Sequence, residues 1–245
     1  CFLFYQEAID YIKNIERSGS DYGIERMRDL LDLLGAPDKR LKFVHIAGTN
    51  GKGSVSAYLT SVLKEAGYKV GTYNSPSVFC YNERWLINGK PLSDEDVAKY
   101  LTVVKERIEN ERILRNAFGI GEFNPTAFEI ETAVAMLAFF DKECDVCVLE
   151  TGLGGRWDAT NAIEDKELAV ITPIGLDHCA ILGDTLRQIA SDVFKWRFER
   201  TTVFGRRQRV RNIYARKAPT HKRRNSDLRR RATEEQALLH KSDRA

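Results

Sequence analysis

Hydrophobic residues are spaced as in helices along some stretches of the chain and gathered into short runs along others. Near the N-terminus they recur at helical spacing over residues 4–12 and again over residues 27–34. Further helices are predicted over residues 55–66, 94–114, 126–141 and 184–192. Apolar runs typical of buried strands lie at residues 43–46, 70–73, 146–150 and 168–172. Strands that alternate with helices predict an α/β fold with a mostly parallel sheet, flanking helices and ligands at the carboxyl ends of its strands.

This pattern stops after Asp192. Residues 195–245 carry 17 Lys and Arg against 5 Asp and Glu, a net charge of +12. The preceding 194 residues have a net charge of −9, so the overall value of +3 hides two different kinds of sequence. We therefore expect a folded domain in residues 1–192 and a basic tail, disordered or aberrant, in residues 193–245.

The composition is that of a globular protein. A hydrophobic content of 43% in 245 residues allows a large core. The sequence shows neither the roughly 20 consecutive apolar residues of a membrane span nor a charged-then-apolar leader, so we expect no membrane partner. Its five cysteines are too scattered for a disulfide framework, which favours the reducing cytoplasm. Cys144 and Cys147 have the spacing of a redox or zinc pair, but they lead into an apolar run and are interpreted as part of a buried strand.

A glycine-rich segment, Gly48-Thr49-Asn50-Gly51-Lys52-Gly53-Ser54, lies between the first predicted strand and a predicted helix. A turn in this context presents backbone N–H groups to a phosphate chain, and the helix dipole adds partial positive charge. Lys52 can place its ammonium on the β- and γ-phosphates. Gly53 separates Lys52 from Ser54, whereas the usual P-loop pattern has Ser or Thr directly after the lysine. The segment predicts a nucleotide site.

Three polar residues each follow a predicted strand: Ser75, Glu150 and His178. Phosphoryl transfer requires a metal that neutralises phosphate charge, and oxygen or imidazole ligands can hold it. Alone, each residue has an ordinary explanation, as a turn residue, a solvated strand end or a structural histidine. Their shared position beside the P-loop favours a joint metal site.

Five ordered motifs within residues 20–192 resemble the folylpolyglutamate synthase/dihydrofolate synthase family of the Mur ligase superfamily. They are the P-loop at 48–54, Ser75-Pro76 with Asn82-Glu83-Arg84, Phe128-Glu129, the segment 150–161, and Ile174-Gly175-Leu176-Asp177-His178. The resemblance implies the Mur ligase central domain in residues 1–192 and an enzyme that performs ATP-dependent ligation. In that reaction the substrate carboxylate attacks the γ-phosphate to give an acyl phosphate. The amino group of L-glutamate then displaces phosphate to form an amide.

The resemblance also implies roles for individual residues. ATP phosphates would be bound by Gly51, Lys52, Gly53 and Ser54, and Mg²⁺ by Ser75, Glu150 and His178. Lys52, Glu150 and His178 would be the catalytic residues. Folate or dihydropteroate would lie against Thr126, Ala127, Phe128, Glu129, Trp157, Asp158 and Ala159.

The chemistry of these side chains suits such a substrate. The Phe128 ring offers a stacking face, and the carboxylates of Glu129 and Asp158 can accept N–H bonds from a pterin-like ring. Phe128 fits ordinary helix core equally well. The segment Asn82-Glu83-Arg84 is either a mobile loop near the substrate, as the resemblance implies, or a charged surface turn.

The chain departs from the family in two places. Family members carry a carbamylated lysine that supports the metal site, but Val193 occupies its position here, and Lys195 comes two residues later. The family's second α/β domain would follow, whereas the sequence stops at Ala245, so we expect a truncated monomer that lacks the C-terminal domain. The abrupt change of composition suggests a disrupted reading frame.

Two alternatives stay open at this point. A Mur-type peptidoglycan precursor ligase shares the P-loop. An inactive nucleotide-binding remnant with a nucleic-acid-binding basic tail would explain the arginine clusters, although we expect no nucleic-acid partner.

Overall fold

A seven-stranded sheet of order β4-β3-β2-β5-β1-β6-β7 organises the residues that the structure, a computed structural model, describes: 3–15, 24–193 and 202–205. The strands are β1 (Phe43–Ala47), β2 (Val70–Tyr73), β3 (Trp85–Ile87), β4 (Lys90–Pro91), β5 (Val146–Glu150), β6 (Leu168–Ile171) and β7 (Thr202–Gly205). The helices are α1 (Tyr5–Lys13), α2 (Glu25–Leu33), α3 (Lys52–Glu65), α4 (Asp94–Phe118), α5 (Ala127–Asp141), α6 (Cys179–Leu182) and α7 (Leu186–Val193). Short 3-10 turns are η1 (Pro37–Arg40), η2 (Tyr81–Arg84) and η3 (Ala159–Ala162).

Five neighbouring strands of this sheet run parallel. Strands β2, β5, β1, β6 and β7 pair in parallel, and β3 and β4 continue the sheet in antiparallel fashion beyond β2. The chain passes from β1 through α3 to β2, on the far side of β5, and only later returns to β6 on the other side of β1. The strand order therefore reverses beside β1, and a reversal of this kind opens a ligand crevice at the carboxyl ends of the strands. The predicted mostly parallel α/β fold is confirmed.

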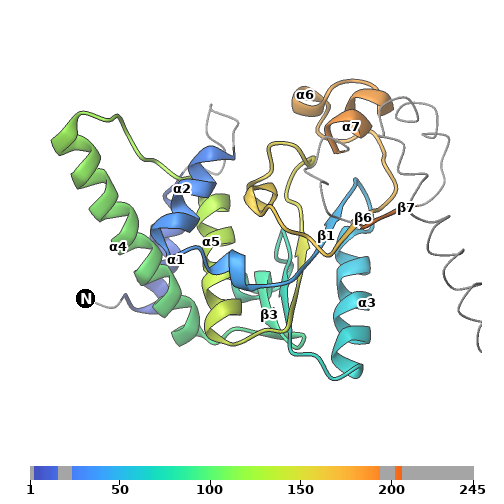
Figure 1. The fold of residues 1–245 in the computed structure, drawn as a ribbon, viewed down its shortest axis with the longest axis horizontal. Helices are drawn as coiled ribbons and strands as arrows, with labels where there is room; N and C mark the ends of the chain where they lie inside the picture. Colours follow the sequence, from blue (N-terminus) through green and yellow to red (C-terminus); the bar gives the residue numbers. More distant parts are fainter. Residues whose placement is uncertain (1–2, 16–23, 194–201, 206–245) are drawn as a thin grey trace, which may run out of the picture. The chain divides into compact units, whose positions relative to one another are not determined.

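Helices cover both faces of the sheet. In Figure 1, α3 lies on one face, and α1, α2, α4 and α5 lie on the other. Val44 and Ile46 of β1 belong to the core beneath α3, where Val55 and Leu59 pack against them. Phe43 faces the larger core on the opposite side. This alternation along β1 is the period of two expected for a central strand, and burial on both faces explains why its sequence is apolar apart from His45.

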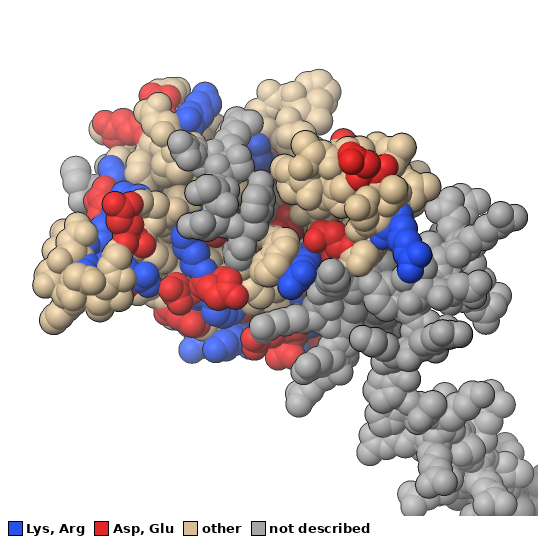
Figure 2. Space-filling view, turned by 90° about the horizontal axis from the view of Figure 1, so that it is seen from above, with Lys and Arg blue, Asp and Glu red and all other residues tan. Residues whose placement is uncertain are grey.

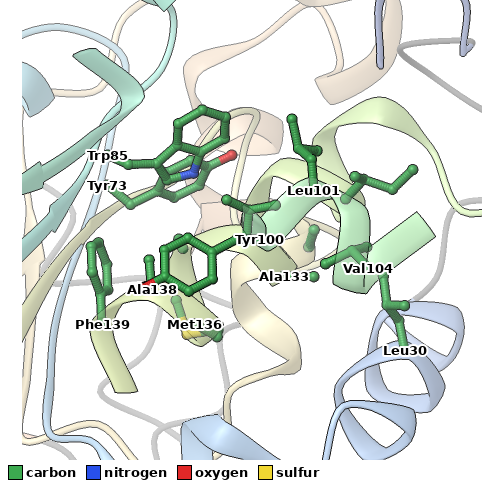
Figure 3. Close-up of a cluster of buried hydrophobic side chains, with 14 of the residues drawn as sticks. Leu30, Tyr73, Trp85, Tyr100, Leu101, Val104, Ala133, Met136, Ala138 and Phe139 are labelled. Carbon is green, nitrogen blue, oxygen red and sulfur yellow. The ribbon is translucent and has the colours of Figure 1, made fainter. Parts of the chain in front are cut away.

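The larger core is built around α5. This helix is buried on nearly every side because it lies between the sheet and the outer helices. Figure 3 shows Tyr73 and Trp85, from β2 and β3, facing side chains of α4 and α5. Thr126 caps α5 and Glu129 returns a bond to the Thr126 backbone, so a capping box fixes where this helix begins.

The structure adds elements that the hydrophobic pattern did not predict. These are the β3–β4 hairpin, the short α6, and β7, which lies within the predicted tail and pairs in parallel with β6. Helix α4 runs to Phe118 instead of residue 114. Cys144 and Cys147 are buried free thiols, which confirms their interpretation as part of a buried strand region. The boundary at 192 stays a prediction, and Lys195 and the arginine clusters lie outside the described residues.

The surface of the described residues carries mixed charge. Figure 2 shows acidic and basic side chains interspersed over the face that it presents. Within the described ranges, no helix is both long enough and apolar enough to pass through a membrane.

Candidate active site

The glycine-rich turn after β1 has the backbone geometry that a P-loop requires. Gly48 adopts φ +131°, and a Cβ at this position would lie 2.8 Å from the carbonyl oxygen of Thr172, so only glycine fits. Gly51 precedes α3 with φ +86°. The Lys52 ammonium folds back over the turn and donates to the carbonyl oxygens of Gly48, at 3.1 Å, and Thr49, at 3.4 Å. The start of α3 and this ammonium together concentrate positive charge at the carboxyl end of β1.

Glu150 ends β5, opposite Ile46 of β1, and lies against the start of α3. Its Oε2 is 3.6 Å from the place where a Cβ on Gly53 would be, so the glycine after Lys52 lets the helix approach this carboxylate. Burial raises the pKa of Glu150 to about 7, and the opposing effects of the Lys52 charge and a backbone N–H bond from Ser75 are smaller. A desolvated carboxylate beside a phosphate-binding turn is suited to hold a cation.

His178 precedes α6 in a left-handed conformation, with φ +49°. Its Nε2 is 3.8 Å from Oδ2 of Asp177, and about half of its side chain is exposed. Within the described ranges, no group of three or more His, Cys, Asp and Glu side chains has the arrangement of a metal site. The set predicted from the sequence has two such residues plus the hydroxyl of Ser75. Ser75 and Glu150 contribute hard oxygen donors of the kind that Mg²⁺ prefers, so the donor chemistry fits that ion.

A cavity of about 760 Å³ lies between α5, the loop after β5 and α6. All seven residues predicted to contact the substrate line it, and so do Ser75 and His178. The cavity is also lined by four charged residues that were not predicted to contact the substrate: Arg26, Arg84, Glu131 and Asp192. A cavity of this size accommodates a drug-sized ligand.

A second, much smaller cavity of about 20 Å³ lies between the P-loop and the loop after β5. Gly48, Thr49 and Lys52 line it on one side, and His178 lines both cavities. Val193, at the position of the family's carbamylated lysine, is buried and also lines this smaller cavity. The two cavities therefore share part of their lining: Gly152 and Leu153 of the loop of residues 152–156, together with His178 and Leu182.

Comparisons with known proteins identify the family. The sequence is 43% identical to dihydrofolate synthase/folylpolyglutamate synthase of Bacillus subtilis over 192 residues, covering 78% of this chain and 43% of that protein. The chain belongs to the folylpolyglutamate synthase/dihydrofolate synthase family.

Solved structures of this family have the same fold. The FPGS–AMPPCP–folate complex superposes with a TM-score of 0.77 and 33% identity, over 83% of this chain and 48% of that one. E. coli FolC in complex with DHPP and ADP superposes with a TM-score of 0.68 and 33% sequence identity, over 79% of this chain and 44% of that one. The chain thus spans less than half the length of these synthases. No family model matches the sequence.

The two carboxylates predicted to accept bonds from a pterin-like ring, Glu129 and Asp158, also have partners within the chain. Glu129 accepts bonds from the Arg26 guanidinium, at 2.8 and 3.1 Å, and from the backbone and hydroxyl of Thr126. Asp158 accepts two backbone N–H bonds from the 152–156 loop and two bonds from Thr160. Both acids line the cavity with these bonds in place, and their role as acceptors for a pterin-like ring stays a prediction.

Phe128 serves both the core and the cavity. Its ring is 5.9 Å from that of Tyr73 and packs against the larger core, while its other side lines the cavity. Trp157 is 42% exposed at the cavity rim, with the Arg156 guanidinium 4.2 Å from its ring centroid. These two aromatic rings are stacking faces that the larger cavity offers.

The segment Asn82-Glu83-Arg84 is no charged surface turn. Asn82 and Arg84 are buried, and both lie in η2. The Arg84 guanidinium donates to Glu131 at 2.9 Å, and the same carboxylate accepts from the Tyr81 hydroxyl at 2.5 Å. This buried cluster holds η2 against α5 beside the cavity.

Replacing Gly152 with alanine is expected to destabilise the chain by about 1–3 kcal/mol. A Cβ at this position would lie 2.6–3.1 Å from three atoms of the Phe128 ring, so the ring must move. Urea unfolding measures the stability loss. Gly175→Ala is the matched control because its new Cβ would meet neighbours only at 3.6 Å or more.

The double variant Gly152→Ala with Phe128→Leu should recover part of the lost stability, since the smaller side chain removes the overlap. A Gly152→Ala chain as stable as Gly175→Ala would contradict the close packing of this loop on Phe128.

Proposed function

We propose that this chain binds ATP and a folate or dihydropteroate for the ATP-dependent ligation of L-glutamate to the substrate carboxylate. The family relationship supports ligase chemistry, and its relatives include structures with AMPPCP, ADP, folate and DHPP. The observation that carries the proposal is the 760 Å³ cavity, which is lined by all seven predicted substrate residues and shares lining residues with the small cavity at the P-loop. That arrangement brings a bound carboxylate toward a bound triphosphate.

The P-loop residues would hold the nucleotide. Backbone N–H groups at Gly51, Gly53 and Ser54 and the Lys52 ammonium would bind the phosphates. Lys52 would give up its present bonds to the turn and stabilise charge on the γ-phosphate. A substrate carboxylate oxygen then bonds to the γ-phosphorus while the bond to the β–γ bridging oxygen breaks and ADP leaves. The amine of L-glutamate attacks the acyl carbon, loses a proton and expels phosphate.

Ser75, Glu150 and His178 would hold Mg²⁺. When bound, this ion neutralises charge on the phosphates and on the departing ADP. Glu150 is central to the set because burial beside Lys52 leaves it without enough solvation for its charge. The roles of Lys52, Glu150 and His178 as catalytic residues belong to the same proposal.

The larger cavity would hold the pterin-bearing substrate. Phe128 and Trp157 offer ring faces for stacking, and Thr126, Ala127 and Ala159 shape the wall. Glu129 contributes by fixing the first turn of α5, and Asp158 by fixing the start of the 152–156 loop. A cytoplasmic location, a monomeric state and the lack of a nucleic-acid partner stay predictions.

The proposal is tested by measuring ADP release with ATP, Mg²⁺ and either folate or dihydropteroate, with and without L-glutamate. The expected result is ADP release that requires both the pteridine substrate and glutamate. Release that depends on UDP-muramyl substrates instead would favour a Mur-type peptidoglycan ligase and overturn the proposal. AMPPCP binding without turnover on any substrate would favour a nucleotide-binding remnant.

A further inference from the structure

The 152–156 loop forms part of the wall that the two cavities share, and His178 and Leu182 form another part. Gly152 and Leu153 line both of them, with the P-loop on one side and Phe128 on the other. The position of this loop therefore sets how a ligand in the larger cavity meets a ligand at the P-loop. Residues 152–156 belong to no helix or strand among the described elements, so hydrogen bonds to other segments must hold the loop in place.

Two carboxylates supply that support from opposite ends of the loop. Oδ2 of Asp158 accepts the backbone N–H bonds of Gly152 and Leu153, both at 2.8 Å. Oδ2 of Asp192, on α7, accepts the backbone N–H bonds of Gly155, at 3.0 Å, and Arg156, at 3.4 Å. Charge-assisted bonds to backbone N–H groups are among the stronger hydrogen bonds in proteins, so the carboxylates determine the loop conformation.

Asp158 is in turn connected to the strand that carries the P-loop. Its Oδ1 accepts the Thr160 hydroxyl proton at 2.5 Å, and the Thr160 oxygen lies 2.6 Å from Nε2 of His45. Because the hydroxyl has one proton and gives it to Asp158, it must accept from His45, which therefore carries a proton on Nε2. His45 is fully buried in β1, and burial lowers its pKa well below the usual value, so the ring is neutral.

We propose that Thr160 and His45 are positioning residues: the chain of bonds from His45 through Thr160 and Asp158 to Gly152 and Leu153 holds the shared wall in register with the P-loop. The proposal rests on the function proposed above. Strand β1 leads directly into the P-loop, so one strand places both Lys52 and, through this relay, the opposite wall. Correct relative placement of two reacting ligands matters greatly, since an error of about 1 Å can cost about 100-fold in rate.

Thr160→Val tests the relay because valine keeps the shape and removes the hydroxyl, and Thr160→Ser is the matched variant that retains it. In the valine variant, amide hydrogen exchange at Gly152 and Leu153 is expected to accelerate. The Kd for folate in the presence of saturating AMPPCP should rise about tenfold, which is less than the roughly 100-fold cost of a 1 Å misplacement. The serine variant should stay close to the wild type in both measurements. AMPPCP affinity should change by no more than about twofold in either variant, because the P-loop keeps its own bonds.

Unchanged exchange and unchanged folate affinity in Thr160→Val would overturn the relay. If the valine variant does not fold, His45→Gln and His45→Leu form a second pair, since glutamine can still donate to Thr160 and leucine cannot. Faster exchange at Gly152 and Leu153 in the leucine variant alone supports the proposal, and equal exchange in both contradicts it. A wild-type chain that binds no folate refutes the proposed function, whereas the exchange measurement still decides whether the relay positions the loop.

Discussion

Lys52→Ala is expected to weaken AMPPCP binding about 100-fold, because the variant loses two charge-assisted hydrogen bonds to phosphate. In the structure the Lys52 ammonium already lies over the P-loop, within hydrogen-bond distance of the Gly48 and Thr49 carbonyl oxygens. Its removal takes away the one charged side chain that the P-loop motif supplies. Isothermal titration calorimetry with AMPPCP measures the effect directly.

Lys64→Ala is the matched control for this variant. Lys64 is an exposed lysine in the last turn of the same helix, so its loss should change AMPPCP affinity by no more than about twofold. A Lys52→Ala chain that binds AMPPCP as well as the control would show that the glycine-rich turn is not the phosphate site.

Glu131→Gln is expected to lower the free energy of unfolding by about 3–5 kcal/mol, because it leaves the Arg84 guanidinium buried without its counter-charge. Both side chains are less than one-tenth exposed. Among the residues that the structure describes, the Arg84 Nε has no hydrogen-bond partner, so its salt bridge to Glu131 is the contact that balances this charge. Urea denaturation followed by tryptophan fluorescence measures the loss.

Glu109→Gln makes the same chemical change in a partly exposed pair with Lys105 on α4 and should cost less than about 1 kcal/mol. Equal effects of the two substitutions would mean that the buried cluster around η2 does not hold this side of the cavity together.

Much of the fold could be predicted because burial imposes a period on the sequence. Strands β2 and β5 begin and end at the predicted residues, since both are central strands whose apolar runs end where the crevice begins. The β3–β4 hairpin was missed although Asn88-Gly89 signals such a turn, with φ +50° and +77° at the two positions. Strand β7 could not be predicted, because it pairs with β6 at the sheet edge and its own sequence has no distinctive pattern.

The candidate site could also be predicted only in part. The motifs shared with the synthase family place the P-loop and the seven cavity residues, and the structure gathers those seven around one cavity. Arg26 and Asp192 escaped notice because their partners are remote in sequence: Arg26 pairs with Glu129, 103 residues away. Arg84 is likewise buried because it pairs with Glu131 of α5, 47 residues away, and no local pattern reveals that pairing. Local spacing shows which chemistry is present, whereas the partners of each charge come only from the packing of the sheet and helices.

A nucleotide site at the P-loop and a pterin site in the larger cavity would meet at the 152–156 loop. A titration of the ¹⁵N-labelled full chain, first with AMPPCP and then with folate, tests it most directly by NMR. We predict that AMPPCP shifts the amide signals of Gly51, Lys52 and Ser54, that folate then shifts those of Phe128 and Trp157, and that Gly152 responds to both. Folate that leaves Phe128 and Trp157 unchanged in the AMPPCP-saturated chain, or AMPPCP that leaves the P-loop unchanged, would contradict the claim.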